Sequence, residues 1–371
     1  MAEPIPIYRG QDFYVPTFQL KLQGKPQGQE VVRDVLSVAY KDSLEQFDSF
    51  EITINNWDAD ARAFKFVDDD LFDPGKEVEL WMGYYGPDRL RRMIRGEITS
   101  LRPTFPAGGP PTLAISGLNL LHRLRTKQES HAYENLTDSE IAEQIGGRLG
   151  LEVRTDDTAR ANEERYRYLF QDNQYDILFL WGRARSLGYD LFVEEDPDTG
   201  ASRLYFGPTV NLERTTYRLS WGKSLIQFQP NLTTANQVGE VTVRGWDAEN
   251  KKKIEYTAKR SEIKTKGVGA EGGQAAIEAS FNQRKEVIAD RPIHSEQEAK
   301  TLAIETLERI AKDLVKGSGA TVGLPDLRAG GVVEIDGLGT RFSGRYFITA
   351  TSHAIADGGY QVQFECRMEE V

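Results

Sequence analysis

The sequence of 371 residues contains a single cysteine, Cys366. One cysteine excludes an intrachain disulfide and any metal site built from several cysteines. Because Cys366 lies in a segment of alternating polar and apolar residues, we interpret it as a packed strand thiol rather than a nucleophile. The scarcity of cysteine fits a chain that folds in a reducing compartment.

Long apolar runs are also missing. No stretch approaches the roughly 18 apolar residues of a membrane span, so we expect no direct membrane insertion. The first seven residues carry neither the basic nor the apolar region of a secretory signal, and we expect no such signal.

Positive charge is in short supply, with 46 basic against 57 acidic residues and a net charge of −11. Affinity for nucleic acid and for anionic lipid rests on Lys and Arg. We therefore expect no specific nucleic-acid binding, although an acidic surface would let a nucleic acid pass without adhering.

Recognisable catalytic motifs are absent as well. The sequence has neither a Gly-x-Ser-x-Gly elbow nor a phosphate-binding loop. No two histidines are spaced i, i+4 as on a zinc-hydrolase helix, and the four are His122, His131, His294 and His353. We interpret His353 as a hydrogen-bonding residue at a strand end. A carboxylate pair such as Glu97 and Glu334 stays open as acid and base, but 57 acidic residues produce such pairs by chance. We expect no catalytic, cofactor-binding or metal-binding residues and no cofactor.

What the chain does contain is one pattern stated twice. Residues 75–80 read Gly-Lys-Glu-Val-Glu-Leu, and residues 330–335 read Gly-Gly-Val-Val-Glu-Ile. Each is followed by Arg-x-x-Ile-Thr, at 95–99 and 345–349, and by a glycine pair ten residues after the isoleucine. The offsets, 330 − 75 = 255 and 348 − 98 = 250, are too long for a solenoid period. The repeat predicts one small β-domain used twice.

The first part of the chain, from residue 10 to about 125, has the texture of short strands. Apolar and polar residues alternate, for example at 18–22, 50–54 and 78–82, and Gly and Pro mark the turns. This spacing favours a small barrel or sandwich. The acidic run Asp68–Asp70 is typical of a solvated loop.

The texture changes at Asn135. Residues Thr137 to Glu140 form a capping box that starts a helix, and a second helix is predicted from about Tyr175 to Leu187, ended by Gly188. The acidic turn at 194–200 lacks the spacing of a calcium loop, which favours a hairpin.

Strands resume after residue 220, and residues 261–280 read as a mobile loop or linker because large apolar groups are few. Another capping box, Ser295 to Glu298, predicts a helix that Gly317 closes. The second copy of the repeat follows.

Two adjacent stretches make the sequence specific. Residues 327–339 read Leu-Arg-Ala-Gly-Gly-Val-Val-Glu-Ile-Asp-Gly-Leu-Gly, and residues 341–353 read Arg-Phe-Ser-Gly-Arg-Tyr-Phe-Ile-Thr-Ala-Thr-Ser-His. Together they resemble the C-terminal signature of the phage late control D family, baseplate hub proteins of contractile tails and contractile injection systems. That family is related to the N-terminal hub part of the VgrG spike proteins. Weaker stretches at 137–142, 179–189, 204–206 and 221–225 match in the same order, so the resemblance covers nearly the whole chain.

The resemblance implies a structural homotrimer in which each subunit carries two tube-like β-barrels. Three subunits then give a pseudo-sixfold ring, a symmetry adaptor between the hexameric inner tail tube protein and a trimeric spike. The chain stops at Val371 without a spike region, so we expect a separate trimeric spike protein. Baseplate wedge or LysM-like adaptor proteins are further expected partners. The implied location is the baseplate of a phage tail or phage-tail-like particle, after synthesis in the bacterial cytoplasm.

The expected fold class is β-rich α+β, with two tube-like antiparallel β-barrels and α/β and helical insertions. The first barrel is assigned to 1–125 and an α/β peripheral module to 126–214. The second barrel is discontinuous, at 215–260 and 318–371, around a loop and helix insertion at 261–317. Two rival functions are a tail-associated cell-wall hydrolase, which needs a cleft with perturbed carboxylates, and a carbohydrate-binding adhesin, which needs clustered exposed aromatics.

Overall fold

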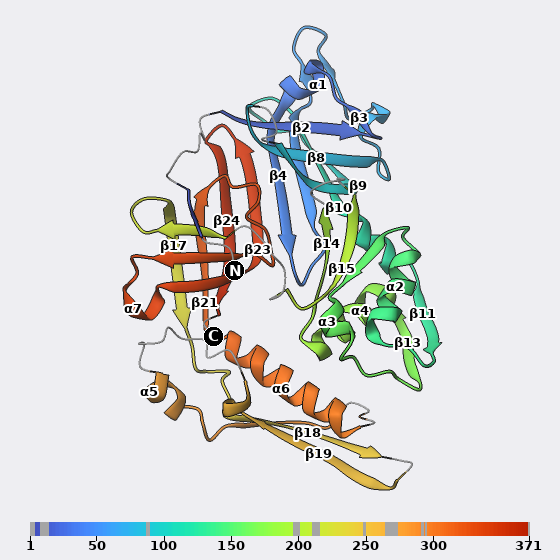
Figure 1. Cartoon of the computed structure of the whole chain (residues 1–371). Coiled ribbons are helices and arrows are strands. Elements are labelled where there is room, and N and C mark those ends of the chain that lie inside the picture. Colours follow the sequence, from blue (N-terminus) through green and yellow to red (C-terminus); the bar gives the residue numbers. More distant parts are fainter. Residues whose placement is uncertain are drawn as a thin grey trace.

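The computed structural model describes residues 4–7, 15–86, 90–195, 201–209, 216–247, 250–263, 274–290, 293 and 295–369. The chain is β-rich α+β, as predicted. Most of its strands join in one sheet, and the helical parts lie beside and below that sheet (Figure 1).

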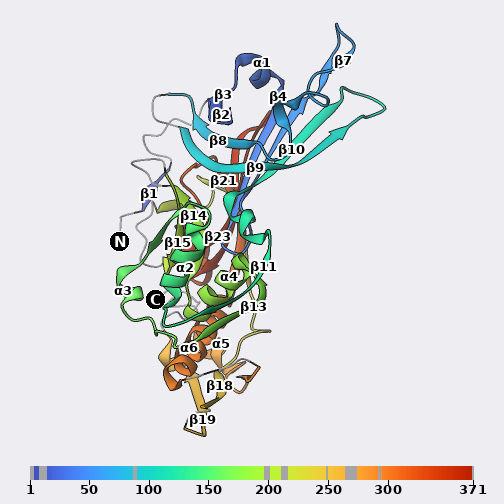
Figure 2. The ribbon, with the colours of Figure 1, turned by 90° about the vertical axis from the view of Figure 1, so that its right-hand side faces the viewer.

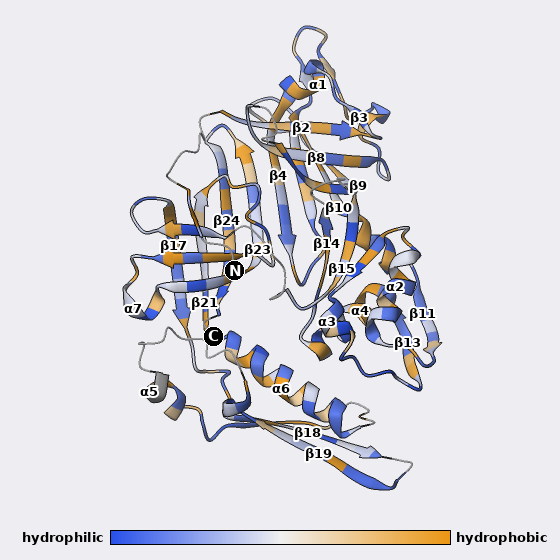
Figure 3. Ribbon diagram, in the orientation of Figure 1, coloured by the Kyte–Doolittle hydropathy of each residue, from blue (hydrophilic) through white to orange (hydrophobic). Residues whose placement is uncertain are grey.

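The first β unit is built from alternating strands whose apolar residues face one side. In β5, for example, Phe50, Ile52 and Ile54 are buried while the residues between them are half-exposed. The alternation is visible as successive bands along β2 and β8 (Figure 3), which run crosswise to β4 (Figure 1). The elements are β2 (Pro16–Leu22), β3 (Lys25–Pro26), α1 (Gln29–Asp34), β4 (Val35–Ser43), β5 (Ser49–Asn55), β6 (Trp57–Asp58), β7 (Ala63–Phe64), the 3-10 helix η1 (Asp70–Phe72), β8 (Glu77–Tyr84), β9 (Leu90–Thr104) and β10 (Thr112–Asn119).

The second β unit repeats this arrangement with strands from both sides of a long insertion. Its elements are β16 (Tyr217–Ser220), β17 (Leu225–Leu232), β21 (Val315–Val322), β22 (Val332–Asp336), α7 (Gly339–Phe342), β23 (Gly344–Ala356) and β24 (Gly359–Met368), and the short β1 (Ile5–Pro6) pairs with β16. One difference is that β16 runs parallel to β22, whereas β2 runs antiparallel to β8.

Backbone hydrogen bonds bear out the repeat seen in the sequence. Gly75 N donates to Ile98 O at 2.8 Å, and Gly330 N donates to Ile348 O at 2.8 Å. Both glycines have a positive φ, +90° and +81°, which a side chain would strain. The two copies therefore occupy equivalent positions in their units.

Register irregularities are repeated too. In β9 the ladder to β10 skips Thr99, and in β23 the ladder to β24 skips Thr349. In β4 the ladder to β5 skips Leu36, and in β17 the ladder to β21 skips Ile226. Four strands of one unit, β4-β5-β10-β9, thus correspond to four of the other, β17-β21-β24-β23.

The two units are joined strand to strand. β23 pairs with β22 through its first half and, on the same edge, with β4 through its second half, from Ala350 opposite Ser43 to Ile355 opposite Val38. This internal junction makes one row, β17-β21-β24-β23-β4-β5-β10-β9. Among the described strands, no pairing closes either unit into a complete barrel.

A peripheral α/β module follows the first unit. Its core packs α2 and α4 against a small sheet, β12-β15-β14. The predicted capping box is confirmed, because Thr137 accepts from Glu140 N and Glu140 reciprocates, and Gly188 ends α4 at φ +68° as predicted. Its elements are η2 (Leu120–Arg125), β11 (Gln128–Tyr133), α2 (Asp138–Gly147), β12 (Glu152–Thr155), α3 (Asp157–Arg160), β13 (Leu169–Tyr175), α4 (Asp176–Leu187), β14 (Asp190–Glu195) and β15 (Ser202–Gly207). β14 and β15 form the predicted hairpin, although its turn at 196–200 lies outside the described residues.

The insertion in the second unit forms a third cluster, in which α6 packs on β18 and β19. The expected division places 240–259 in the second barrel; the structure pairs these residues with β20 in a separate sheet. Its elements are β18 (Glu240–Asp247), β19 (Lys252–Lys259), η4 (Arg260–Glu262), α5 (Gln274–Ala279), β20 (Lys285–Ile288) and α6 (Glu296–Lys312). Of the predicted loop at 261–280, residues 264–273 lie outside the described residues, and residues 274–279 form the helix α5 instead of a loop.

One helix boundary was predicted wrongly. Ser295 does cap α6, accepting from Glu298 N at 3.0 Å, but the helix ends at Lys312, and Gly317 lies inside β21. Gly317 is needed there because a Cβ would come within 2.8 Å of the Phe228 ring. Glycine in a strand often marks such a close approach rather than a helix end.

A single apolar core runs under both β units. Cys366 belongs to it, 2% exposed in β24, which confirms the packed strand thiol. Burial raises the pKa of this thiol, so it stays protonated and unreactive.

Candidate assembly surface

The face of the row opposite the core is polar across both units. Its side chains come from alternate positions of every strand and are mostly Ser, Thr, Gln and Ala: Ser49, Thr53, Thr112, Ala114 and Ser116 in the first unit, and Ser318, Ala320, Gln361, Gln363 and Ala354 in the second. Charges of both signs occur on it, for example Glu51, which pairs with Arg102 at 2.7 Å. Such a face offers no concentrated charge to hold a ligand.

The polar face is hollowed over the internal junction. A depression of about 580 Å³ is lined from both units, among others by Lys41, Ser43, Ser318, Ser352 and Gln363. It is open and polar, unlike the mostly apolar cavities that bind small molecules. Its significance is that the two units present one continuous concave surface.

On the core side of the junction lies a buried ionic network. Asp42, on β4 and 6% exposed, accepts hydrogen bonds from Arg328 Nε at 2.7 Å and from the backbone N of Ala329 and Thr351 at 3.1 Å each. Arg328 also donates to Met93 O at 3.0 Å, and its guanidinium stacks on the Tyr40 ring at 4.4 Å. Arg328 thus connects the loop before β22 to two strands of the first unit.

The electrostatics of this network follow from burial and pairing. Burial would raise the pKa of Asp42, but the adjacent Arg328 charge and the hydrogen bond from Thr351 outweigh it and hold that pKa below its ordinary value. Burial and the Asp42 charge together raise the pKa of Asp48 to about 7. Asp48 accepts from Asn119 Nδ2 at 3.0 Å.

His353 belongs to the same network and shows one correct and one wrong expectation. It is a hydrogen-bonding residue, with Nδ1 2.9 Å from Tyr360 Oη and Nε2 2.9 Å from Leu327 O. However, it lies within β23 and not at a strand end, and it is 0% exposed. Burial lowers its pKa to about 4. With both ring nitrogens engaged and no access to solvent, it is a structural residue.

Glu97 and Glu334, the carboxylates that the sequence left as a possible acid and base, do not lie on neighbouring strands. Glu97 lies on β9, accepts from Arg123, and has its Oε2 3.1 Å from His122 Nε2. The Arg123 hydrogen bond lowers the pKa of Glu97, the opposite of what a general acid needs. Glu334 lies on β22 and pairs with Arg218 at 3.2 Å.

The remaining histidines give no site either. His131 lies on β11 with its ring 4.6 Å from that of Tyr133, and His294 lies outside the described residues. In the described part of the chain, no three His, Cys, Asp or Glu side chains gather as a metal site would require. No helix in the described residues is long and apolar enough to cross a membrane.

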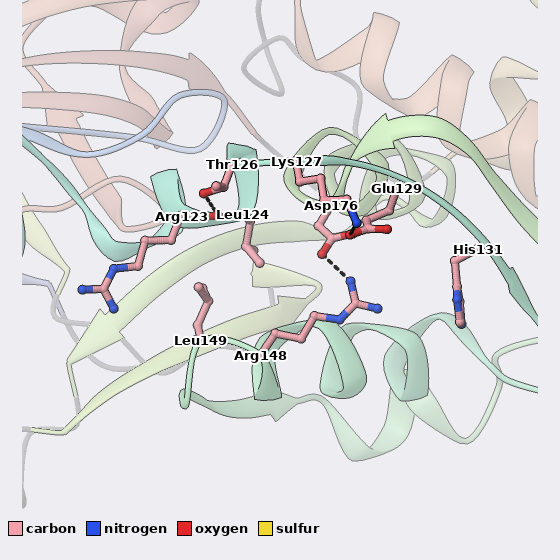
Figure 4. Close-up of a pocket in the computed structure, with 9 residues that line it drawn as sticks. All are labelled: Arg123, Leu124, Thr126, Lys127, Glu129, His131, Arg148, Leu149 and Asp176. Carbon is pink, nitrogen blue, oxygen red and sulfur yellow. Dashed lines mark hydrogen bonds and ion pairs between the residues drawn. The ribbon is translucent and has the colours of Figure 1, made fainter.

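A second pocket, of about 400 Å³, lies in the peripheral module (Figure 4). It is lined by residues of η2, β11 and the end of α2, and Arg148 at its rim is bonded to Asp176. Figure 4 shows His131 set apart from this pair. The lysine and arginine residues that line the pocket each pair with a carboxylate: Arg123 with Glu97, Lys127 with Glu129, and Arg148 with Asp176. Among the described residues, the pocket therefore offers no unpaired charge for binding a ligand.

Three aromatic rings cluster at the far end of the β9–β10 hairpin, which projects beyond the rest of the chain together with β7 (Figure 2). The Trp57 and Phe64 ring centroids are 5.5 Å apart, and those of Phe64 and Phe105 are 5.2 Å apart. Phe64 and Phe105 are 43% and 57% exposed. No local sequence pattern indicates this patch, because its three residues lie on β6, on β7 and just after β9.

Comparison with known proteins gives a family and a fold. The Alg8 N-terminal domain family matches residues 14–357. No curated protein matches the sequence.

Several solved structures share the fold over 95% of the chain. The 43 kDa tail protein of prophage MuSo2 from Shewanella oneidensis has a TM-score of 0.71 at 14% identity, with 98% of that protein covered. A tail protein from Neisseria meningitidis MC58 has a TM-score of 0.66 at 14% identity, with 96% covered. The E. coli c3393 protein, a component of the type VI secretion system that is similar to the T4 tail proteins gp27 and gp5, has a TM-score of 0.55 at 12% identity, with 77% covered. At these identities the likeness shows the fold.

Proposed function

The chain belongs to the Alg8 N-terminal domain family, and from its fold and its internal repeat we propose that it is a structural baseplate hub. In this proposal it adapts the hexameric tail tube to the trimeric spike of a contractile phage tail or contractile injection system. The family description names no activity, so the proposal depends on geometry and on the solved tail proteins that share the fold.

The observation that carries the proposal is the matched register of the two β units. Both units skip one residue at Thr99 or Thr349 and one at Leu36 or Ile226, so their backbones present the same edges and the same polar face. A chain with two equivalent units forms six equivalent units as a homotrimer, which is what a hexameric tube requires of its neighbour. Closed cyclic symmetry is the usual form of such assemblies.

The continuous polar face supports a channel wall. Eight strands per chain make twenty-four in a trimer, and at about 4.8 Å per strand they enclose a perimeter of roughly 115 Å, or a channel roughly 35 Å wide between backbones. The inner face carries mostly small polar side chains, with charges of both signs and no concentration of either, and such a face would let cargo pass without adhering. In this assembly each unit acts as the tube-like barrel of the late control D family. The expected division into units at 1–125, 126–214, 215–260 with 318–371, and 261–317 is part of the proposal with one change, since residues 240–259 join the insertion and not the second barrel.

The proposed partners are the inner tail tube protein on one side of the ring and a trimeric spike protein on the other. The α/β module, which stands apart from the polar face, would meet baseplate wedge or LysM-like adaptor proteins. The chain acts without turnover, as a protein made in the bacterial cytoplasm and incorporated in the baseplate.

Native mass measurement of the purified chain, alone and with its tube and spike proteins, tests the proposal. We expect a trimer in at least the mixed sample. A chain that stays a monomer in all samples and joins no ring contradicts the hub, and hydrolysis of peptidoglycan by the isolated chain would replace it with an enzyme.

Carbohydrate binding is a second candidate because of the exposed rings of Phe64 and Phe105. Their edge-on packing, at 70° between planes, leaves no flat platform of the kind on which sugars stack. Saccharide binding by the monomer, lost in Phe105→Ala, would favour the adhesin over the hub.

A further inference from the structure

The internal junction between the two units provides a template for the contact between two copies of the chain. We propose that the outer half of β9 in one copy pairs with β17 of the next, in the register that β23 and β4 use within the chain. This inference rests on the proposed hub and names the surface that closes its ring.

The two edges are the ends of the row. Among the described strands, β17 pairs only with β21, and the outer half of β9, Ser100 to Thr104, pairs only with β10. Within the row, the equivalent of this half of β9 is the half of β23 that pairs with β4, and the equivalent of β17 is β4 itself. Unpaired edges of this kind invite strand addition.

Residue equivalence fixes the register. β9 residues are numbered 250 below their β23 equivalents, as 348 − 98 = 250, and β17 residues 190 above their β4 equivalents, as 225 − 35 = 190. Ser352 opposite Lys41 inside the chain therefore predicts Arg102 opposite Asn231 between copies. The other predicted pairs are Ser100 with Thr233, Leu101 with Leu232, Pro103 with Pro230 and Thr104 with Gln229.

The two prolines are the sharpest feature of this register. Gly323 N donates to Tyr360 O, so Gly317, in the same phase of β21, points its amide to β24, and the amide side of Pro230 faces the open edge. Asn56 N donates to Pro111 O, and the same alternation turns the nitrogen of Pro103 to its open edge.

Proline on an edge removes a donor and discourages pairing. Each hydrogen-bonded pair of an antiparallel ladder carries two N–H···O bonds, and each proline removes one of them. When Pro103 and Pro230 stand opposite each other, both missing bonds fall in one pair, and the pairs on either side of it stay complete. The prolines therefore fit the proposed register, and each removes a donor that an unrelated strand would need.

Side chains complete the match. On the core side, the predicted pairs are apolar: Leu101 with Leu232, both half-buried, and the prolines. Beyond them Phe105, 57% exposed, extends toward Phe228 of the neighbouring copy. On the other side, Arg102 with Asn231 and Thr104 with Gln229 continue the polar face.

A cysteine pair tests the register. Arg102 and Asn231 would form a non-hydrogen-bonded pair with Cα atoms about 4.5 Å apart, which suits a disulfide. We expect the double variant R102C/N231C of the full chain, oxidised alone and in the tail particle, to yield covalent dimers and trimers in a non-reducing gel. The variant K41C/S352C, the same pair at the internal junction, should form a disulfide within one chain. R102C/Q227C, four residues off register, should stay uncrosslinked.

The outcomes separate the two proposals. If native mass shows a trimer but R102C/N231C gives no covalent oligomer while K41C/S352C closes, the ring uses another surface: the edge pairing is wrong and the hub stands. If R102C/Q227C crosslinks as well as R102C/N231C, the register is wrong. If no sample contains a trimer, the hub itself fails, and the edge pairing fails with it.

Discussion

At the internal junction the core-side pairs are Asp42 with Thr351 and Tyr40 with His353, whereas the equivalent positions of the open edges hold Leu232, Leu101 and two prolines. The proposed backbone register is the same at both places, but the core-side residues are charged or polar at the internal junction and apolar at the open edges. Within one chain, every donor and acceptor can be supplied by residues that fold together, as Arg328 and Thr351 do for Asp42. An edge that waits in water before assembly would have to strip water from a charge, which is costly unless the pairing is complete. Apolar side chains gain from the same step.

Removal of Arg328 is the strongest way to break the internal junction. Arg328→Ala leaves Asp42 buried without its charge partner, which should cost about 3–5 kcal/mol of unfolding free energy. Chemical denaturation of the purified chain measures it.

Arg91→Ala is the matched control. Arg91, on β9, joins the first unit to the same loop before β22, with Nε 3.2 Å from Asp326 Oδ1, but the two side chains are 53% and 43% exposed. We expect a loss below about 1 kcal/mol. Equal losses in both variants would mean that burial does not distinguish the two pairs.

The repeat that makes this comparison possible could be read from the sequence, because Gly75, Gly330 and the two Arg-x-x-Ile-Thr segments are local patterns. Helix starts were also predictable, since a capping box such as Thr137 to Glu140 is complete within four residues. The internal junction between the two units could not be predicted from the sequence. Asp42 and Arg328 are 286 residues apart and sit in segments that look like ordinary strand and turn.

The prediction that Gly317 ends a helix was wrong for the same reason. Its role is set by Phe228, a residue on the neighbouring strand, and nothing within its own segment distinguishes a helix end from a strand glycine. His353 looked like a strand end because the repeat ends there, but pairing with β4 continues to Ile355 and pairing with β24 to Ala356. Sequence patterns indicate local structure, whereas the roles of Gly317 and His353 are determined by contacts with residues far away in the sequence.

A negative charge placed at the open edges tests the proposed contact between copies of the chain. Leu101→Glu and Leu232→Glu each place a carboxylate in the apolar pair between copies, which should weaken each contact by about 2–4 kcal/mol. Because both leucines are only half-buried in the single chain, its unfolding free energy should change by less than about 1 kcal/mol.

Ser318→Glu is the control for this pair, since it adds the same charge at an exposed position of the polar face on β21, which belongs to neither open edge. Native mass spectrometry should show the trimer reduced in the two leucine variants and retained in the control. A trimer that is insensitive to all three variants places the copy-to-copy contact elsewhere.

Glycine and aromatic residues complement each other in both units, but on exchanged strands. In the first unit Phe50 of β5 covers Gly117 of β10, whereas on the equivalent strands of the second unit Phe364 of β24 covers Gly319 of β21. Gly317, also on β21, is covered by Phe228 of β17. Gly317→Ala should cost about 1–3 kcal/mol because its Cβ meets the Phe228 ring at 2.8 Å.

Gly358→Ala, where a Cβ meets nothing within 4 Å, should change the unfolding free energy by less than about 0.5 kcal/mol. In a double-mutant cycle, Phe228→Leu should relieve part of the Gly317→Ala loss. Strict additivity of the two changes would show that the ring and the glycine are not in contact.

The smallest effect is expected from Asp48→Asn, and it depends on pH. The pKa of Asp48 is raised from 3.8 to about 7 by burial, so between these pH values the folded chain keeps a proton that the unfolded chain loses. Stability from this group is therefore fully present below pH 4 and falls as pH rises toward 7. His353 acts in the opposite sense, since its pKa is lowered from 6.5 to about 4 and stability rises with pH over that window. The two slopes offset each other in the native chain.

Asp48→Asn removes the pH dependence of stability that Asp48 contributes and leaves the contribution of His353. Its unfolding free energy should rise with pH between about 4 and 6.5, and near pH 7.5 it should exceed that of the native chain by about 1 kcal/mol, because Asn119 and Ser43 still donate to a neutral acceptor. The variant His353→Gln should show the reverse trend, with stability falling as pH rises. Thermal unfolding from pH 4 to 8 distinguishes them, and parallel profiles for all three chains would mean that neither group titrates with folding. Asp48 bonds to Ser43 and Asn119 within the first unit, and His353 lies at the internal junction, where the equivalent position of the open edge holds Pro103. This pH dependence should therefore appear in folding of the single chain and be absent from assembly of the ring.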